Sequence, residues 1–212
     1  MESTKTRILK KLLETDGYLS GQELCEQLGV SRTAVWKYMK QLKEEGYEIE
    51  AVQNKGYCLK DVPDVLGESE IKSRLHTRWV GQTLYYYDEI DSTNTQIKRL
   101  AEEDAPHGTL AVADYQSRGK GRRGRAWDSP HGSAIYMSIL FRPEIRPDRA
   151  SMLTLVIGLS VTQAIRSNLG LQAQIKWPND VVLNGKKLVG ILTEMSAQMN
   201  YIEYLVTGIG IN

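Results

Sequence analysis

The apolar residues of the first 45 positions recur three or four residues apart, in three separate runs. Because this spacing places them on one face of a helix, the pattern predicts helices over residues 4–15, 20–28 and 31–45. The apolar positions that we expect to be buried are Ile8, Leu9, Leu12, Leu13, Leu24, Leu28, Val35, Met39 and Leu42.

Glycine and serine mark the expected ends and starts of these helices. Gly17 follows the first run, and Gly29 follows the second, where a left-handed residue commonly ends a helix. Ser20 precedes the second run, and Glu23 lies three residues later, which is a capping-box pattern. Ser31 is the expected N-cap of the third helix.

The next segment, YEIEAVQNKGYCLK, alternates around Asn54-Lys55-Gly56 as a β-hairpin does. Three helices followed by a hairpin is the order of a winged helix-turn-helix domain, whose third helix enters the major groove of DNA. The candidate DNA-binding residues at the start and on the outer face of that helix are Ser31, Arg32, Thr33, Trp36, Lys37 and Lys40. The alternatives are that Trp36 packs beneath the hairpin, or that the segment is a small interaction domain with solvated lysines.

The segment DVPDVLG, residues 61–67, is expected to separate a DNA-binding domain (1–62) from a second domain (63–212). In the second domain the pattern changes to mixed strand and helix, with a hairpin turn at Asn184-Gly185. Thr93 and Gln96 form another capping-box pattern. The expected strands are 83–90, 109–116, 133–141, 174–183, 186–195 and 201–212, and the expected helices are 93–103 and 148–169.

These patterns predict an α+β fold with a mixed sheet. The second expected helix of this domain is apolar on most sides, so we expect it to be buried against the sheet. No run approaches eighteen consecutive apolar residues, and the N-terminus lacks the apolar core of a signal peptide, so no membrane partner is expected.

Composition adds little to this picture. The 212 residues are 41% hydrophobic and 25% charged, with a net charge of +1, as in ordinary globular proteins. Any DNA site must therefore depend on the placement of charge. Two cysteines and three scattered histidines do not favour a metal cluster, and the cysteines are expected to be reduced thiols in the cytoplasm.

Five cations and three glycines lie in the stretch SRGKGRRGRAW, residues 117–127, directly after an expected strand. Such a stretch can be a solvated loop, an arm for nucleic acid or a loop that closes on phosphate. The glycines let backbone N–H groups approach a ligand, and arginines match phosphate oxygens. The Walker A pattern is absent, and strand-like residues rather than a helix follow Trp127. Trp127 can stack on a purine or simply cover the core.

Five motifs in order resemble those of biotin protein ligases. They are DSTN (91–94), YQSRGKGRRGRAW (115–127), KWPND (176–180), GKKLVGIL (185–192) and GIGIN (208–212). With the winged helix in front, the chain is similar to the bifunctional class that also represses the biotin operon. The resemblance implies activation of biotin with ATP to biotinyl-5′-AMP, then transfer to a lysine of a biotin carboxyl carrier protein. It also implies a homodimer that binds operator DNA, and Mg²⁺ with the nucleotide.

The resemblance also implies roles for individual residues. The expected catalytic residues are Arg122 and Lys187, beside the carboxylate and the α-phosphate. The expected biotin-binding residues are Ser92, Thr93, Asn94, Gln116, Lys120, Gly121, Arg122 and Lys187. The expected ATP or adenylate residues are Arg125, Trp127, Asn179, Asp180 and Asn212, with Asp180 a candidate for holding Mg²⁺ through the phosphates. Without the motifs, Lys187 is a surface hairpin lysine and residues 92–94 are a plain helix cap.

Members of this class continue for about a hundred residues beyond the position of Asn212, so the sequence is expected to be a fragment of a longer protein. Two other functions remain open. One is a ligand-sensing DNA-binding repressor without ligase turnover. The other is a lipoate or octanoate transferase on a related fold, which the loop at 117–127 disfavours.

Overall fold

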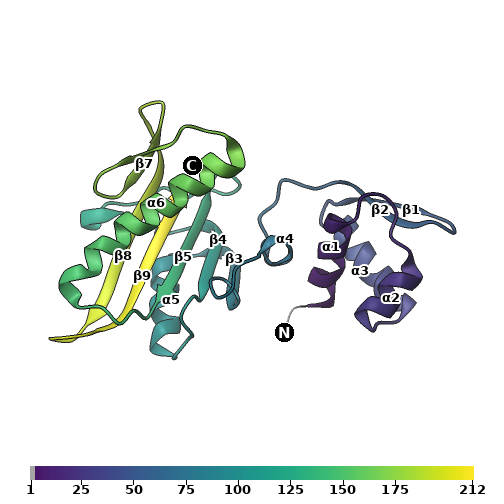
Figure 1. Cartoon of the computed structure of the whole chain (residues 1–212), viewed down its shortest axis with the longest axis horizontal. Helices are drawn as coiled ribbons and strands as arrows, with labels where there is room; N and C mark the ends of the chain where they lie inside the picture. Colours follow the sequence, from purple (N-terminus) through teal and green to yellow (C-terminus); the bar gives the residue numbers. More distant parts are fainter. Residues whose placement is uncertain (1–2) are drawn as a thin grey trace. The chain divides into compact units, whose positions relative to one another are not determined.

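A computed structural model describes residues 3–212, and the chain divides into two compact units between His76 and Thr77. The first unit has three helices, a two-stranded hairpin and a short fourth helix (Figure 1). Their bounds are α1 (Thr4–Glu14), α2 (Gly21–Leu28), α3 (Arg32–Glu44), β1 (Glu48–Val52), β2 (Gly56–Asp61) and α4 (Glu68–Arg74).

The core of the first unit is the one that helical spacing predicts. Of the nine expected apolar positions, only Leu13 is partly rather than fully buried. Burying a leucine or isoleucine contributes about 1.5–3 kcal/mol, so these contacts supply most of the stabilisation of so small a unit. Tyr47 and Ile49, which follow α3, close the same core.

The three predicted caps of α2 and α3, at Ser20, Gly29 and Ser31, all form. Ser31 Oγ accepts a hydrogen bond from the Ala34 N–H at 3.2 Å, and Gly29 ends α2 in the left-handed region at φ 67°. Ser20 caps α2 through the Gln22 N–H at 3.2 Å. The predicted capping box is wrong in its second half, because the Glu23 carboxylate instead accepts from Gln27 one turn later.

Helix α4 belongs to the first unit, so the division lies after the expected boundary between residues 62 and 63. It packs against α1, and the Tyr47 hydroxyl donates to Glu70 Oε2 at 2.6 Å. Thr6 Oγ1 also contacts Ser69 Oγ at 3.4 Å. These contacts hold the residues after Pro63 on the helical unit, whereas the composition of residues 61–67 indicated a break.

The second unit is built on a seven-stranded mixed sheet in the order β3-β4-β5-β9-β8-β7-β6. Strands β3 and β4 are parallel and every other neighbouring pair is antiparallel. The bounds are β3 (Leu84–Ile90), α5 (Thr93–Glu102), β4 (Leu110–Gln116), β5 (Ile135–Phe141), α6 (Ala150–Leu169), β6 (Gln174–Lys176), β7 (Asp180–Leu183), β8 (Lys186–Ala197) and β9 (Ile202–Ile211), with short 3₁₀ turns at Arg122–Gly124 and Pro147–Arg149.

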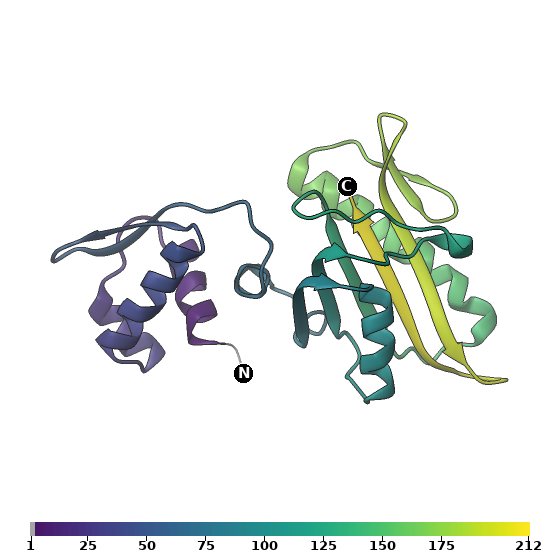
Figure 2. The same cartoon turned by 180° about the vertical axis from the view of Figure 1, so that it is seen from behind.

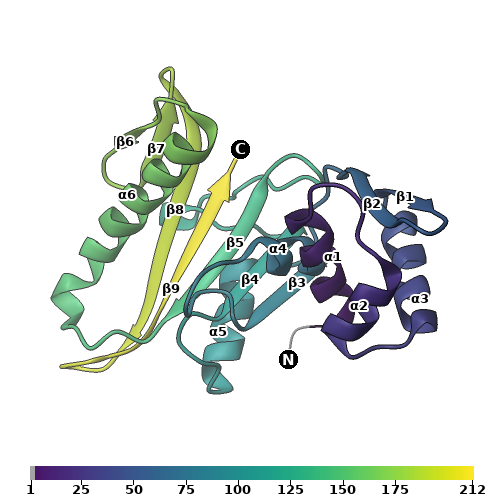
Figure 3. The same ribbon diagram turned by 45° about the vertical axis from the view of Figure 1, so that its right-hand side comes forward.

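The two long helices cover opposite faces of this sheet. Helix α6 lies over β6, β7 and β8, whereas α5 lies over β4, β5 and β9 (Figures 1 and 2). The predicted α+β class with a mixed sheet is therefore confirmed. Strands β6 and β7 accompany only the first part of β8, so the outer edge of β8 has no neighbouring strand beyond Ile191 within residues 3–212 (Figure 3).

The helix expected over residues 148–169 is buried on one face only, although its sequence is apolar on most sides. Ile157, Val161 and Ile165 are buried against the sheet, whereas Met152 and Val156 on the outer face are more than half exposed. On length and composition alone, residues 147–169 could cross a membrane, but a helix of a sheet protein passes the same test. The packing of its inner face identifies it as a helix that covers one face of the sheet.

Two local predictions in the second unit are wrong. The expected strand 174–183 is divided by a turn at Trp177-Pro178-Asn179, with a cis peptide bond before the proline. Thr93 and Gln96 form no capping box, because Ser92 is the N-cap and the Thr93 hydroxyl is occupied by buried partners. The predicted turn at Asn184-Gly185 does join β7 to β8.

Candidate active site and DNA-binding face

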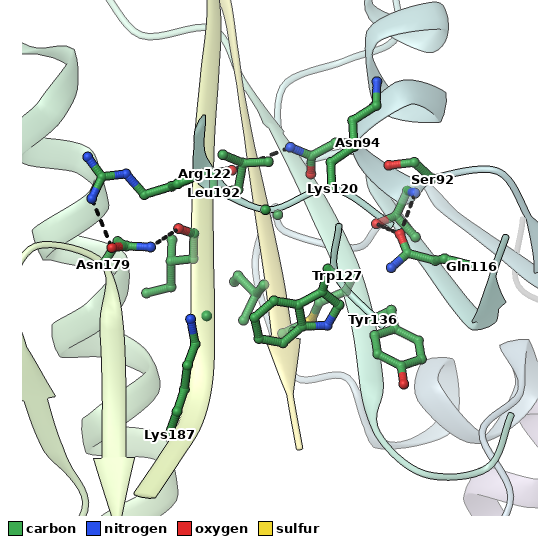
Figure 4. A pocket seen from close by; sticks show the side chains of 18 residues that line it. Ser92, Asn94, Gln116, Lys120, Arg122, Trp127, Tyr136, Asn179, Lys187 and Leu192 are labelled. Carbon is green, nitrogen blue, oxygen red and sulfur yellow. Dashed lines mark hydrogen bonds between the residues drawn. The ribbon is translucent and has the colours of Figure 1, made fainter. Parts of the chain in front are cut away.

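A pocket opens between the start of α5, the 117–132 loop and the strands β8 and β9 (Figure 4). Residues from five of the predicted motifs line it together, although they are far apart in the sequence. The lining residues are Ser92, Thr93, Asn94, Gln116, Lys120, Gly121, Arg122, Trp127, Tyr136, Met137, Asn179, Lys187, Gly190, Ile191, Leu192, Gly208, Ile209 and Gly210.

The floor of the pocket is made by glycines of two neighbouring strands. Gly190 of β8 pairs with Gly210 of β9, and Gly208 lies two residues before Gly210 on β9. A Cβ atom at Gly190 or Gly210 would lie 2.4 or 2.7 Å from the Trp127 ring, and one at Gly208 would lie 2.2 Å from Asn94 Oδ1. Sequence reasoning did not assign these glycines to the site, although their alternation in GIGIN places them on one strand face.

Trp127 forms a wall of the pocket, with its indole lying over the glycine floor (Figure 4). Its Nε1–H is buried and has no hydrogen-bond partner among residues 3–212. Buried polar groups are nearly always paired, so an orphaned donor in a pocket wall is available to a ligand. The indole thus combines an apolar face with one free donor.

Two cations lie on the opposite side of the pocket from Ser92 and Gln116 (Figure 4). Arg122 Nη1 donates to Asn179 Oδ1 at 3.0 Å, and Asn179 Nδ2 in turn donates to the Ile191 carbonyl at 3.0 Å. This chain of contacts fixes the guanidinium of Arg122 against the sheet.

Lys187 is the second cation. Its Nζ lies 4.9 Å from the Trp127 ring centroid and 2.8 Å from Asp180 Oδ1. The approach to Asp180 has ion-pair distance but not hydrogen-bond geometry, which leaves that buried oxygen without a hydrogen bond among the described residues. The lysine donors are therefore not saturated, and a second anion can share them.

The opposite side of the pocket is polar and buried. Ser92, Thr93 and Asn94 are each less than 5% exposed. Gln116 Oε1 accepts from the Thr93 N–H at 2.9 Å, and Gln116 Nε2 donates to Ser129 Oγ at 2.9 Å. These bonds fix which way the Gln116 amide faces, so its oxygen lies on the side of Thr93.

Asp91 secures the entry to helix α5. Its Oδ1 accepts from the Ser92 N–H at 2.7 Å, and its Oδ2 accepts from Arg99 Nη2 at 2.7 Å. Burial raises the pKa of Asp91, but the hydrogen bonds from Arg99 and from the Ser92 backbone outweigh it and hold the pKa below its ordinary value. The carboxylate is thus ionised and anchors the turn that carries the pocket residues.

The 117–132 loop begins as a tight local fold rather than as an open strand or helix. The Gly121 N–H donates to the Arg125 carbonyl at 2.7 Å, and the Trp127 N–H donates to the Gly119 carbonyl at 2.9 Å. Lys120 reaches across to Thr95 Oγ1 at 3.0 Å. The loop therefore closes one side of the pocket with Lys120, Gly121 and Arg122.

Ten of the thirteen expected ligand residues line this pocket. Arg125, Asp180 and Asn212 do not, although Asp180 contacts Lys187. Arg125 is exposed, and the Asn212 N–H is bonded to the Leu188 carbonyl at 2.9 Å. Within residues 3–212 no cluster of three or more histidine, cysteine, aspartate or glutamate side chains could hold a metal ion, and both cysteines are free thiols.

The predicted DNA-binding residues form the start and the outer face of α3. Ser31 is its N-cap, and Arg32, Thr33, Lys37 and Lys40 are exposed. Trp36 is 61% exposed, so it does not pack beneath the β1–β2 hairpin. A groove beside α3 and that hairpin is lined by Arg32 and Lys55 among others.

Comparison with known families assigns the chain to one of them. The model of the biotin/lipoate A/B protein ligase family matches residues 86–212, which is more than half of the sequence. The chain belongs to the biotin/lipoate A/B protein ligase family. An HTH domain model matches residues 4–58, so this member of the family carries a helix-turn-helix unit in front.

Individual members of the ligase family support the same assignment. The bifunctional ligase/repressor BirA of Bacillus spizizenii is 47% identical over 214 aligned residues, covering 100% of this chain. The chain spans 66% of the length of that relative. The resemblance to biotin protein ligases that the motifs indicated is confirmed.

Two solved structures share the fold of the second unit. The biotin protein ligase of Aquifex aeolicus in complex with biotin and ATP is 38% identical with a TM-score of 0.51, over 62% of this chain and 52% of that one. The biotin protein ligase of Leishmania major in complex with biotinyl-5-AMP is 25% identical with a TM-score of 0.53, over 62% and 57% of the two chains. The mixed sheet of this chain is thus the ligase-family sheet.

Proposed function

We propose that this chain carries the biotin-activating site of a bifunctional biotin ligase and repressor. In the first step the biotin carboxylate attacks the α-phosphorus of ATP, which gives biotinyl-5′-AMP and releases pyrophosphate. In the second step a lysine amine of a biotin carboxyl carrier protein attacks the activated carbonyl carbon. An amide forms and AMP leaves, so the bonds balance without a further reactant.

The observation that carries this proposal is the polarity of the pocket. One side offers buried hydrogen-bond acceptors from residues 93 and 116, and the other offers the cations Arg122 and Lys187. A ligand with a polar ring at one end and a carboxylate at the other matches this arrangement, and biotin is such a molecule. The apolar indole of Trp127 lies between the two ends.

The first step mainly requires that negative charge be neutralised. A carboxylate is already a nucleophile, so the reaction does not need a general base, but it must be held against the negative triphosphate. Preorganised cations are suited to this task. Arg122 is positioned by Asn179, and Lys187 by Asp180 and Trp127. We assign the neutralisation of the carboxylate and the α-phosphate to these two cations.

The residues around Lys187 also fit Mg²⁺ that arrives with ATP. Mg²⁺ commonly uses one or two protein carboxylates together with substrate phosphates. Asp180 Oδ1 is buried without a hydrogen bond among the described residues, so it is the candidate carboxylate. The ion would neutralise phosphate charge, and Asn179 beside it would face the nucleotide.

The repressor half of the proposal rests on the first unit. Helix α3 presents Arg32, Thr33, Lys37 and Lys40, which suits the major groove and the phosphates of operator DNA. We also propose a cytoplasmic homodimer. The outer edge of β8 beyond Ile191 has backbone groups without a neighbouring strand in the described chain, and such an edge can pair with a second copy.

The test of the enzymatic half is pyrophosphate release from ATP on addition of biotin, with a biotin-free reaction as background. Transfer is followed as incorporation of labelled biotin into a carrier domain. Biotin-dependent release in the wild type and its loss in Arg122→Ala are the expected results. Absence of biotin-dependent release would contradict the ligase, and biotin-responsive DNA binding without release would favour a ligand-sensing repressor.

A further inference from the structure

A chain of short hydrogen bonds runs from an ion pair on one side of the sheet to the polar end of the pocket. Lys98 Nζ lies 2.6 Å from Glu194 Oε1, and Glu194 Oε2 accepts from Asn94 Nδ2 at 2.8 Å. Asn94 Oδ1 lies 2.6 Å from Ser138 Oγ, which lies 2.7 Å from Thr93 Oγ1. None of the roles proposed above uses Lys98, Glu194 or Ser138.

The carboxylate at one end fixes how the Asn94 amide is turned. An ionised carboxylate can only accept hydrogen bonds, so the Asn94 NH₂ group must face Glu194. The amide oxygen then faces Ser138, beneath Gly208, where a Cβ would lie only 2.2 Å away. Asn94 therefore has one orientation while Glu194 is charged, and the Leu192 carbonyl, which accepts from Asn94 Nδ2 at 3.4 Å, favours the same one.

The orientation of Asn94 in turn sets the direction of the hydroxyl hydrogens. An amide oxygen only accepts, so the single Ser138 hydrogen points to Asn94. Ser138 therefore cannot also donate to Thr93, and the 2.7 Å contact between them requires the Thr93 hydrogen. That contact is shorter than the 3.1 Å between Thr93 Oγ1 and Gln116 Oε1, which supports this assignment.

The result is a pair of hydrogen-bond acceptors at the pocket. With its hydrogen directed to Ser138, Thr93 Oγ1 keeps lone pairs for a ligand. Gln116 Oε1, 3.1 Å away, also keeps accepting capacity besides the Thr93 N–H. Two acceptors so close together suit one N–H donor placed between them.

We propose that Lys98 and Glu194 are positioning residues that set this chain of hydrogen bonds so that the pocket accepts an N–H group of a cyclic urea. The inference rests on the proposed function, since biotin carries such a ring. The ion pair does not touch the ligand. It acts through Asn94 and Ser138 on the direction of one hydroxyl hydrogen in Thr93.

The charge of Glu194 is secured by its surroundings. Its side chain is 27% exposed and that of Lys98 is 33% exposed. Burial raises the pKa of Glu194, but hydrogen bonds from Lys98 and Asn94, with the nearby charges of Lys98 and Lys120, bring the pKa below its ordinary value. The group therefore remains an acceptor through the neutral pH range.

The substitution Glu194→Gln should reverse the whole chain. Lys98 still requires an acceptor, so the new amide turns its oxygen to Lys98 and its NH₂ group to Asn94. Asn94 is then expected to give up its long 3.4 Å hydrogen bond to the Leu192 carbonyl and to flip, so that its NH₂ group faces Ser138. Ser138 then donates to Thr93, and Thr93 donates to Gln116, which consumes both acceptors at the pocket.

When Lys98 is removed as well, the amide of residue 194 no longer has to turn its oxygen toward a lysine. In the double variant Lys98→Met with Glu194→Gln, residue 194 can turn its oxygen back to Asn94, and the original direction can form again. We expect Glu194→Gln to weaken biotin binding about tenfold or more, because a ligand N–H loses its acceptors. The double variant is expected to bind biotin more tightly than Glu194→Gln alone, a rescue that loss of packing would not produce.

Isothermal titration of biotin into the full chain measures these affinities, with Glu102→Gln as the matched control on α5. Glu102 is exposed and lies outside the hydrogen-bonded chain, so its variant is expected to match the wild type. Equal affinity of Glu194→Gln and wild type, or a double variant weaker than Glu194→Gln, would overturn the proposal. Loss of biotin binding in the wild type would instead contradict the proposed function.

A second measurement tests the hydrogen-bonded chain without any ligand. In the wild type the Asn94 side-chain NH₂ protons should show nuclear Overhauser effects to Leu192 and Glu194 on β8. In Glu194→Gln they should show them to the Ser138 methylene instead. Retention of the wild-type pattern in Glu194→Gln would refute the reversal, whatever the protein binds.

Discussion

Lys187 Nζ lies over the face of Trp127, 4.9 Å from the ring centroid, and 2.8 Å from the Asp180 carboxylate. The lysine therefore stands between an anion and an aromatic face, and a cation interacts favourably with both. Its side chain is 42% exposed, so the charge is also open to the pocket. This placement separates the role of Lys187 from that of a surface hairpin lysine.

Lys187→Ala is expected to slow adenylate formation by about 10²–10³-fold, because a preorganised charge in the transition state is lost. Biotin affinity should fall much less, since the ring end of the pocket is untouched. Single-turnover pyrophosphate release and biotin titration measure the two effects. Lys186→Ala, an exposed neighbour on the same strand, is the control, and a wild-type adenylation rate in Lys187→Ala would contradict the assignment.

The glycine floor makes a separate prediction. Gly190→Ala would place a Cβ 2.4 Å from the Trp127 ring, so the indole must move away from β8. We expect biotin affinity to fall about tenfold or more while the sheet remains folded. Gly158→Ala on α6 is the matched control, because its Cβ would meet Ile191 at an ordinary 3.6 Å. Biotin titration with thermal unfolding checks both variants, and unchanged affinity in Gly190→Ala would rule out a close indole wall.

For the helix-turn-helix unit, Lys37→Ala is expected to weaken binding to all DNA sequences alike. A lysine that contacts phosphate releases about one counterion, so the slope of log affinity against log salt should fall by about 1. Fluorescence anisotropy over a salt series gives the slope. Lys186→Ala, which removes one lysine from the second unit, is the control and should leave the slope unchanged. An unchanged slope in Lys37→Ala would exclude a phosphate contact.

The elements that sequence patterns predicted well are those with local causes. The Val35, Met39 and Leu42 stripe, the Ser31 cap and the Asn184-Gly185 turn depend on residues a few positions apart. Where distant residues compete, the local pattern fails. The Thr93 hydroxyl is drawn to Ser138 on β5 and does not cap its helix, a contact 45 positions apart.

The same distinction holds for the site. Motif residues such as Gln116, Arg122 and Lys187 do meet at one pocket, as the ordered motifs indicated. Lys98 and Glu194 gave no comparable signal, because they are 96 positions apart and neither stands in a quoted motif with an obvious charge partner. Their relation depends on α5 lying over the sheet beside β8, which local periodicity does not encode.

The Glu194 carboxylate also predicts how stability depends on pH. Its pKa in the folded chain is below the ordinary value of 4.5, so its stabilising contribution is complete above about pH 4.5 and is lost as the pH falls through the folded-state pKa. The stability difference between wild type and Glu194→Gln should therefore be largest near neutral pH and shrink toward pH 3.

Urea unfolding followed by tryptophan fluorescence measures this difference best in a Trp36→Phe background, since the remaining tryptophans all lie in the second unit. Glu102→Gln is again the control, and its stability should track that of the wild type at every pH. A difference between wild type and Glu194→Gln that stays constant from pH 7 to pH 3 would mean that Glu194 gains nothing from ionisation. That outcome would remove the charge on which the orientation of Asn94 depends.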